Sequence, residues 1–175
     1  MKVFIAGART VTDLDFSVQK KLAAIINKEY DILVGDCSGV DSSVQRFCNN
    51  FQYKKVTVYA SNGRARNNIG NWNVKAVSVS PELHGFDFYK QKDLAMAMDA
   101  DCGFMIWNGE SRGTLNNMIN LISQEKEVLV YMTAIKKMVV IRSFTELSSL
   151  IRQYAPNALK TYIKLSKDSM QIAMY

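Results

Sequence analysis

Side chains suited to binding an anion gather in residues 107–118, which read WNGESRGTLNNM. Gly109 and Gly113 permit a tight turn there, because glycine adopts backbone dihedrals that are closed to other residues. Ser111 and Thr114 would then point at the same spot as the unpaired amides that begin the following helix. Helix N-termini of this kind favour anions, phosphate above all. The stretch therefore predicts a phosphate-binding turn, and the alternative interpretation is an ordinary helix cap by serine or threonine.

Two further glycine turns occupy the same position between a strand and a helix. Residues 2–5 run into the turn AGART, and Asp13 or Asp15 would cap the helix that follows. Residues 31–34 form a second apolar run, which ends in GDCSGVDSS. Three units of strand, glycine turn and helix favour a parallel sheet whose binding loops gather at the carboxyl ends of the strands.

The rest of the chain continues this alternation. Apolar runs predict further strands at residues 55–60, 102–107, 127–132 and 137–141, and helical periodicity predicts helices at residues 86–98, 112–123 and 144–154. We therefore expect a Rossmann-like α/β fold of three layers, with a mostly parallel sheet of about five to seven strands. Residues 61–80 are dense in asparagine and glycine and predict a long loop.

Positive charge is concentrated near the end of the chain. The net charge is +6, and residues 133–175 hold seven lysines and arginines against two acidic residues. We assign residues 1–155 to one domain and residues 156–175 to a basic tail of that domain, built as edge strands at 160–165 and 170–175 or as a dimer arm. Lysines and tyrosines of such a tail would suit a nucleic acid, and a solvated surface is the alternative.

Composition argues against several classes of protein. Cys37, Cys48 and Cys102 are odd in number and far apart, which is typical of reduced thiols in the cytoplasm and offers no zinc site. His84 is the sole histidine, which argues against a histidine-rich metal centre and a serine triad. The apolar runs are too short to cross a bilayer. We expect a cytoplasmic protein without a metal, a cofactor or a membrane contact.

Four motifs in order carry a family resemblance. GARTVTD near the start, VGDCSGVDSSVQ after the second strand, RARNN at residues 64–68 and DADCGFMIWNGESRGTLNNMI resemble the SLOG superfamily. This superfamily unites the DNA-processing Smf/DprA fold with the lonely guy phosphoribohydrolases, and the similarity spans about residues 2 to 132. The chain looks most like the small, stand-alone YpsA-like proteins, a branch associated with nucleotides or nucleotide-derived ligands.

The resemblance implies a ligand pocket at the carboxyl ends of the strands. Its expected lining is Gly7, Arg9, Gly35, Ser38, Gly39, Asp41, Arg66, Asn67, Gly109, Ser111, Gly113 and Thr114. Arg9 follows a strand end, where its guanidinium would hold a phosphate in two places, and Arg64 or Arg66 would add charge. Trp107 and Trp72 are candidates to stack on the base, with a core position as the alternative for Trp107.

Catalysis depends on two positions of this resemblance. In the lonely guy enzymes the phosphate turn is followed by a threonine, one residue and a glutamate, which cleaves base from ribose 5-phosphate together with an upstream arginine. Here the glutamate position falls on Asn116 and the arginine position on Lys92. An amide supplies neither acid nor base, so binding is favoured over hydrolysis. Glu110 and Lys92 remain the candidate catalytic residues.

The sequence thus predicts a homodimer that binds a phosphate-bearing nucleotide at the carboxyl edge of its sheet, as a sensor or carrier. One alternative is an enzyme that hydrolyses or transfers the N-glycosyl bond of a nucleotide. That enzyme would be a phosphoribohydrolase, or a relative of the deoxyribosyltransferases with Glu82 or Glu110 as nucleophile. The other alternative is a single-stranded DNA-binding protein related to the DNA-processing family.

Overall fold

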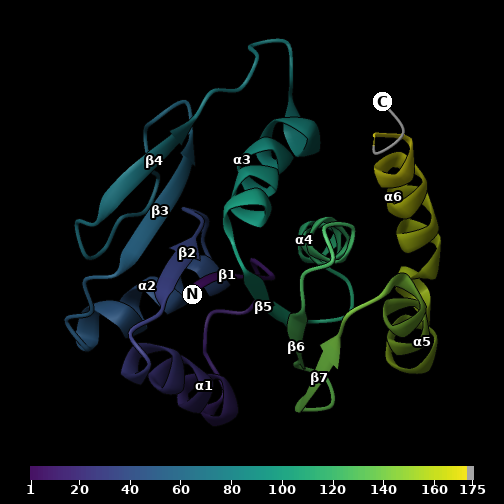
Figure 1. Cartoon of the computed structure of the whole chain (residues 1–175), viewed down its shortest axis with the longest axis horizontal. Helices are drawn as coiled ribbons and strands as arrows, with labels where there is room; N and C mark the ends of the chain where they lie inside the picture. The colour runs from purple at the N-terminus through teal and green to yellow at the C-terminus, as the bar shows by residue number, and fades with distance from the viewer. Residues whose placement is uncertain (173–175) are drawn as a thin grey trace.

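The computed structural model describes residues 1–172 and contains a single seven-stranded sheet (Figure 1). Its spatial order is β4-β3-β2-β1-β5-β6-β7. The strands are β1 (Lys2–Gly7), β2 (Asp31–Val34), β3 (Val56–Ser61), β4 (Asn73–Val77), β5 (Cys102–Trp107), β6 (Val128–Met132) and β7 (Lys137–Ile141). All neighbouring pairs are parallel except β6 and β7, which are antiparallel. The predicted Rossmann-like fold with a mostly parallel sheet is confirmed.

Helices cover both faces of the sheet, so the fold has three layers (Figure 1). The helices are α1 (Phe16–Asn27), α2 (Val40–Asn50), α3 (Gly85–Asp99), α4 (Arg112–Ile122), α5 (Phe144–Tyr154) and α6 (Leu159–Ile172). Successive residues of a strand point to opposite faces, and β1 shows this directly. Ile5 packs with Leu22 of α1 and Val44 of α2 in one core, whereas Phe4 packs with the helices α3 to α6 in the other.

The order of the strands creates a crevice beside β1. The chain adds β2, β3 and β4 outward on one side of β1, and α3 then returns it to β5 on the other side. Gly7 at the end of β1 is paired with Ile106 near the end of β5. The helices that follow these two strands, α1 and α4, lie on opposite faces of the sheet, so the connections diverge at this point. In open α/β sheets such a switch point holds the ligand.

Two segments differ from the sequence-based expectation. The predicted loop at 61–80 contains β4, an exposed edge strand of mixed polarity whose pattern gives little signal. Edge strands at 160–165 are wrong, because residues 159–172 form α6, with Tyr162 and Leu165 spaced for one helical face and buried in the core shared with α4. Of the strand expected at 170–175, residues 173–175 lie outside the described part of the chain. No helix within residues 1–172 is long and apolar enough to cross a membrane.

Candidate functional site

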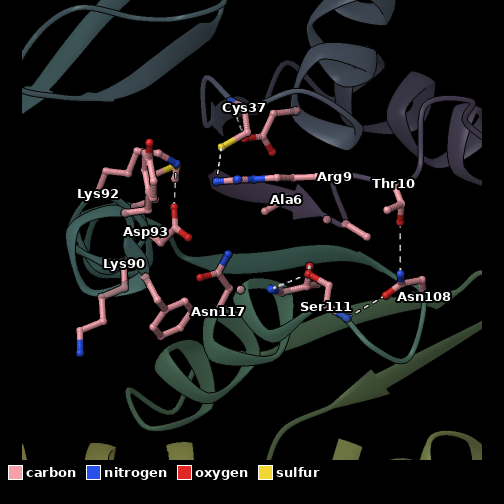
Figure 2. A pocket seen from close by; sticks show the side chains of 18 of the residues that line it. Ala6, Arg9, Thr10, Cys37, Lys90, Lys92, Asp93, Asn108, Ser111 and Asn117 are labelled. Atoms are coloured by element: carbon pink, nitrogen blue, oxygen red, sulfur yellow. Dashed lines mark hydrogen bonds and ion pairs between the residues drawn. The ribbon is translucent and has the colours of Figure 1, made fainter. Parts of the chain in front are cut away.

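A cavity of about 610 Å³ opens at the carboxyl ends of β1 and β5. Its wall comes from the loop after β1, the loop between β2 and α2, one side of α3, and the turn that leads into α4. Figure 2 shows the side chains that line it, with the α3 residues on one side and the turn before α4 on the other. The cavity therefore lies at the switch point of the sheet, where three of the predicted turns meet.

The turn before α4 is held by its own side chains. Asn108 Oδ1 accepts hydrogen bonds from the backbone N–H groups of Glu110 and Ser111, at 3.0 and 2.9 Å. Gly109 supplies a φ of 83°, which side chains rarely allow. Ser111 Oγ then accepts from the backbone N–H of Thr114 at 3.3 Å and from its hydroxyl at 2.9 Å. Ser111 is thus a helix cap that also lines the cavity.

The first turn of α4 leaves room for a ligand. A Cβ atom added to Gly113 would meet no atom within 4 Å, so the backbone is accessible from the cavity. The first amides of a helix have no partner inside the helix and carry its positive dipole end. Trp107, by contrast, is fully buried, and its indole N–H donates to the Ser111 carbonyl at 3.2 Å. The structure therefore places Trp107 in the core rather than against a ligand.

The loop after β1 is fixed between β5 and α2. A Cβ at Gly7 would lie 2.4 Å from the Ile106 carbonyl oxygen, and one at Gly39 would lie 2.4 Å from the Arg9 carbonyl oxygen. The Arg9 side chain extends across the cavity toward the thiol of Cys37, with Nη2 3.6 Å from Sγ (Figure 2). Its guanidinium also lies 5.3 Å from the ring centre of Tyr89. Within residues 1–172, Arg9 forms no ion pair.

Arg66 approaches the same region but is paired with a carboxylate. Burial alone would raise the pKa of Asp36, and hydrogen bonds from the side chain and backbone of Arg66 hold it below its usual value. The Arg66 guanidinium also lies 4.8 Å from the Tyr89 ring centre. Asn67 Nδ2 donates to the Asp36 carbonyl oxygen at 2.9 Å. Arg66 and Asn67 thus tie the loop after β3 to the loop after β2.

A buried group of charges forms the end of the cavity against α3. Lys92 is 2% exposed, and its Nζ lies 2.8 Å from Asp93 Oδ1. Burial acts to lower the pKa of Lys92, but the carboxylates of Asp93 and Asp41 raise it above its usual value, so the amine stays charged. A Cβ at Gly35 would lie 2.4 Å from Asp41 Oδ2 and 2.9 Å from Lys92 Nζ. The absence of a side chain at Gly35 therefore leaves the space that the Asp41 carboxylate and the Lys92 ammonium occupy.

Asp41 is the carboxylate of this group whose protonation is most perturbed. It is 6% exposed, lines the cavity, and accepts a hydrogen bond from the Cys37 N–H at 3.2 Å. Burial raises its pKa to about 6, against the opposing effect of the Lys92 ammonium. Asp93 and Asp36 add a smaller upward effect through their charges. Near pH 6, Asp41 is therefore divided between its two protonation states, and at neutral pH it is mostly ionised.

Asn117 is a side chain of the cavity wall that sequence reasoning missed. It is 3% exposed and lines the cavity, and its Oδ1 accepts no hydrogen bond from any described residue. Figure 2 shows its amide pointing into the cavity from α4. Asn116, to which the family glutamate position was assigned, does not line the cavity. The signal lay in the helical spacing, because Asn117 follows Thr114 by three residues and so shares its face of α4.

The other expected site residues divide into two groups. Those that line the cavity are Gly7, Arg9, Asp41, Ser111, Gly113 and Thr114, together with Glu110 and Lys92. Those that lie outside its lining are Gly35, Ser38, Gly39, Arg66, Asn67, Trp107 and Gly109. The indole N–H of Trp72 donates to the Tyr53 carbonyl at 2.8 Å, and Trp72 is buried in the core against α1 and α2. The described residues offer no cluster of three histidine, cysteine or acidic side chains for a metal.

Comparison with known proteins adds a fold relationship. No family model matches the chain, and no curated protein matches it in sequence. A solved structure of DNA processing protein A from Helicobacter pylori, from a study of how that protein binds single-stranded DNA, is similar with a TM-score of 0.58. The likeness covers 94% of this chain and 80% of that chain at 13% identity. At such identity the likeness shows the fold alone.

Proposed function

We propose that this protein binds a phosphate-bearing nucleotide in the cavity above β1 and β5, and that it acts as a sensor or carrier. The unpartnered Oδ1 of Asn117 carries the proposal. A buried acceptor without a partner costs about 1–3 kcal/mol, and a base amine or ribose hydroxyl that donates to it removes this cost. Because the amide also offers two donors, it suits the mixed polar edge of a nucleobase.

The phosphate group is assigned to the first turn of α4. The open space around Gly113 lets an anion approach the free amides of the turn, where the helix dipole favours negative charge. Arg9 supplies the cation, because it has no carboxylate partner in the described structure and its guanidinium fork suits a phosphate. Phe86 and Tyr89 of α3 are aromatic residues of the cavity wall, and a base would contact them beside the arginines that already lie against their rings.

We favour binding over turnover because α4 presents asparagine side chains where a hydrolase would need a carboxylate. Neither Asn116 nor Asn117 can exchange a proton with a substrate, and Lys92 is paired with Asp93. One observation favours the alternative of N-glycosyl hydrolysis or transfer, namely the pKa of Asp41 at about 6 beside the cavity. A protonated Asp41 would be able to protonate a leaving base.

Single-stranded DNA binding is the second alternative. It is favoured by the fold shared with DNA processing protein A and by the basic residues of the last quarter of the chain. The finer parts of the proposal are membership of the YpsA-like branch, a cytoplasmic location and a homodimer. Their support is the sequence resemblance and the free cysteines Cys37, Cys48 and Cys102.

A thermal-shift screen tests the proposal. The purified chain is heated with nucleotides, cyclic nucleotides, dinucleotides and ribose phosphates, and each mixture is then chromatographed for products. A ligand present at a hundred times its dissociation constant stabilises the fold by about 2.7 kcal/mol, which is readily measured. A shift without product supports the proposal. A shift with released base establishes the enzymatic alternative through Asp41 or Glu110, and no shift with any nucleotide contradicts the proposal.

A further inference from the structure

A second, basic groove lies beside the cavity, between the start of α4 and the face of α6. Its volume is about 260 Å³, and its lining is Arg112, Lys160, Thr161, Lys164 and Leu165. Figure 1 shows α4 between α3 and α6, so the groove borders the same helix end as the proposed phosphate site. Three cationic side chains therefore share one small concavity.

These cations are not neutralised by the protein. Within residues 1–172, neither Arg112 nor Lys160 nor Lys164 forms an ion pair. The charges of Arg112 and Lys164 act on the carboxylate of Asp87, which itself pairs with Lys90 at 2.7 Å. Lys90 is the main cause of the lowered pKa of Asp87, and Arg112 and Lys164 contribute to it. Asp87 is thus paired outside the groove with Lys90, and the groove cations Arg112 and Lys164 act on it through their charge alone.

The position of Lys160 and Lys164 argues for an anion in the groove. They are four residues apart on α6, so the two ammonium groups lie on the same face of the helix, where like charges repel. Thr161 adds a hydroxyl donor to the same wall. An anion held between these groups would relieve the repulsion and accept hydrogen bonds from three donors.

Arg112 connects the groove to the cavity. It stands between Ser111 and Gly113, which both line the cavity, whereas its own side chain lines the groove. The guanidinium carbon lies 3.8 Å from the ring centre of Phe86, another residue of the cavity wall. This stacking fixes the side chain in place at the boundary. One ligand is therefore able to contact both spaces across the first turn of α4.

We infer that the groove formed by Arg112, Lys160 and Lys164 binds a second phosphate group of the ligand whose first phosphate occupies the α4 turn. The ligand class is a nucleotide with two separated phosphate-bearing positions, such as a nucleoside 3′,5′-bisphosphate or a dinucleotide. This inference rests on the proposed nucleotide site. It adds a specificity determinant that a nucleoside monophosphate does not use.

Calorimetric titration of the full chain tests the inference with matched ligands. The four nucleoside 5′-monophosphates are compared with the corresponding 3′,5′-bisphosphates and with 5′-phosphorylated dinucleotides, whose second phosphate is the 3′,5′-phosphodiester. We expect at least one ligand with two phosphate positions to bind tenfold or more tightly than its monophosphate. In the double variant Lys160→Ala, Lys164→Ala, this preference is expected to fall below twofold, while monophosphate affinity stays unchanged.

Lys167→Ala is the matched control, because Lys167 is an exposed lysine of the same helix that does not line the groove. It is expected to keep the full preference. Equal affinity of the native chain for both ligand classes would overturn this inference and leave the nucleotide site standing. So would a double variant that keeps the preference. If the native chain binds none of these nucleotides, the inference fails; the proposed function fails as well if the thermal-shift screen with cyclic nucleotides and ribose phosphates also shows no binding. If the inference holds, the ligand that binds more tightly, the bisphosphate or the dinucleotide, identifies the source of the second phosphate.

Discussion

Arg66 binds both carboxylate oxygens of Asp36, with Nε 3.0 Å from Oδ2 and Nη2 2.7 Å from Oδ1. Its backbone N–H donates to the same Oδ2 at 3.0 Å. Asp36 is 2% exposed, so this three-bonded pair is the means by which a buried carboxylate is satisfied. Arg66 therefore acts as a structural brace between two loops, whereas Arg9, which forms no ion pair within residues 1–172, is the cation that the proposed function assigns to the phosphate.

Removal of this brace should destabilise the fold. Among the described residues, Arg66→Ala leaves Asp36 with Lys92 at 3.9 Å as its ion-pair partner, and we expect the free energy of unfolding to fall by about 2 kcal/mol. The half-exposed position of Arg66 keeps this below the value for a fully buried pair. Urea unfolding measures the change, and Arg64→Ala, an exposed arginine of the same loop, is expected to cost nothing. Equal effects of the two variants would show that the pair has no structural role.

In contrast to Arg66→Ala, Arg9→Ala should lower ligand affinity and leave stability unchanged. The side chain is exposed and unpaired, so its removal is expected to leave the melting temperature of the ligand-free protein unchanged. Nucleotide affinity is expected to fall more than tenfold, because a charge-assisted contact to the phosphate is lost. Titration with the best ligand of the thermal-shift screen measures the loss. Unchanged affinity would remove Arg9 from the site.

Asn117→Leu is expected to raise the stability of the ligand-free protein while it lowers the affinity for nucleotide. Leucine is similar in size and removes the unpartnered oxygen, so the ligand-free protein should gain about 1 kcal/mol in its free energy of unfolding. The same change should lower nucleotide affinity more than tenfold. Asn116→Leu, next in sequence but off the cavity, serves as the control and should leave affinity intact. A destabilised Asn117→Leu protein would mean that the amide is satisfied within the fold.

Asp41 should give the protein a distinctive dependence on pH. Its folded pKa of about 6 lies above the unfolded value of 3.8, so its contribution to stability is largest below pH 3.8 and is lost as the pH rises through 6. Between pH 7.5 and pH 5, we expect the native chain to gain about 1 kcal/mol relative to Asp41→Asn, measured by urea unfolding. Asp36 has a lowered pKa, so its contribution changes only below this window. Parallel stability curves for the two proteins would contradict the assignment.

Most of the fold was predictable because the apolar pattern and the glycine turns agree. The expected strand at 31–34 and the expected helix at 144–154 match the structure in both bounds. The strand β4 was missed because, at the edge of the sheet, it needs no alternating apolar face. The helix α6 was misread because the buried apolar positions among its residues 159–169, Tyr162 and Leu165, are too few for periodicity to separate a helix from a strand.

The site was predictable only where its groups belong to one turn. Ser111, Gly113 and Thr114 at the start of α4 and Arg9 after β1 were expected, and the structure brings them to one cavity, whereas Gly109 lies outside its lining. Contacts between residues far apart in the sequence, such as the one between Asp36 and Lys92, could not be predicted from local patterns. Whether an asparagine such as Asn117 has a partner depends on every neighbour in the folded state. Likewise, nothing in the local pattern distinguishes an exposed Trp107 from a buried one.

The unsatisfied amide of Asn117 has a consequence for the lifetime of the protein inside a cell. Under the proposed function, the empty chain keeps a burial cost that a bound nucleotide would remove, so the open, cleavable population would shrink as the cavity fills. Proteolysis that samples this population would then slow in proportion to occupancy. The abundance of the protein would therefore follow the concentration of its ligand. The degradation rate of the protein would report how much ligand the cell contains.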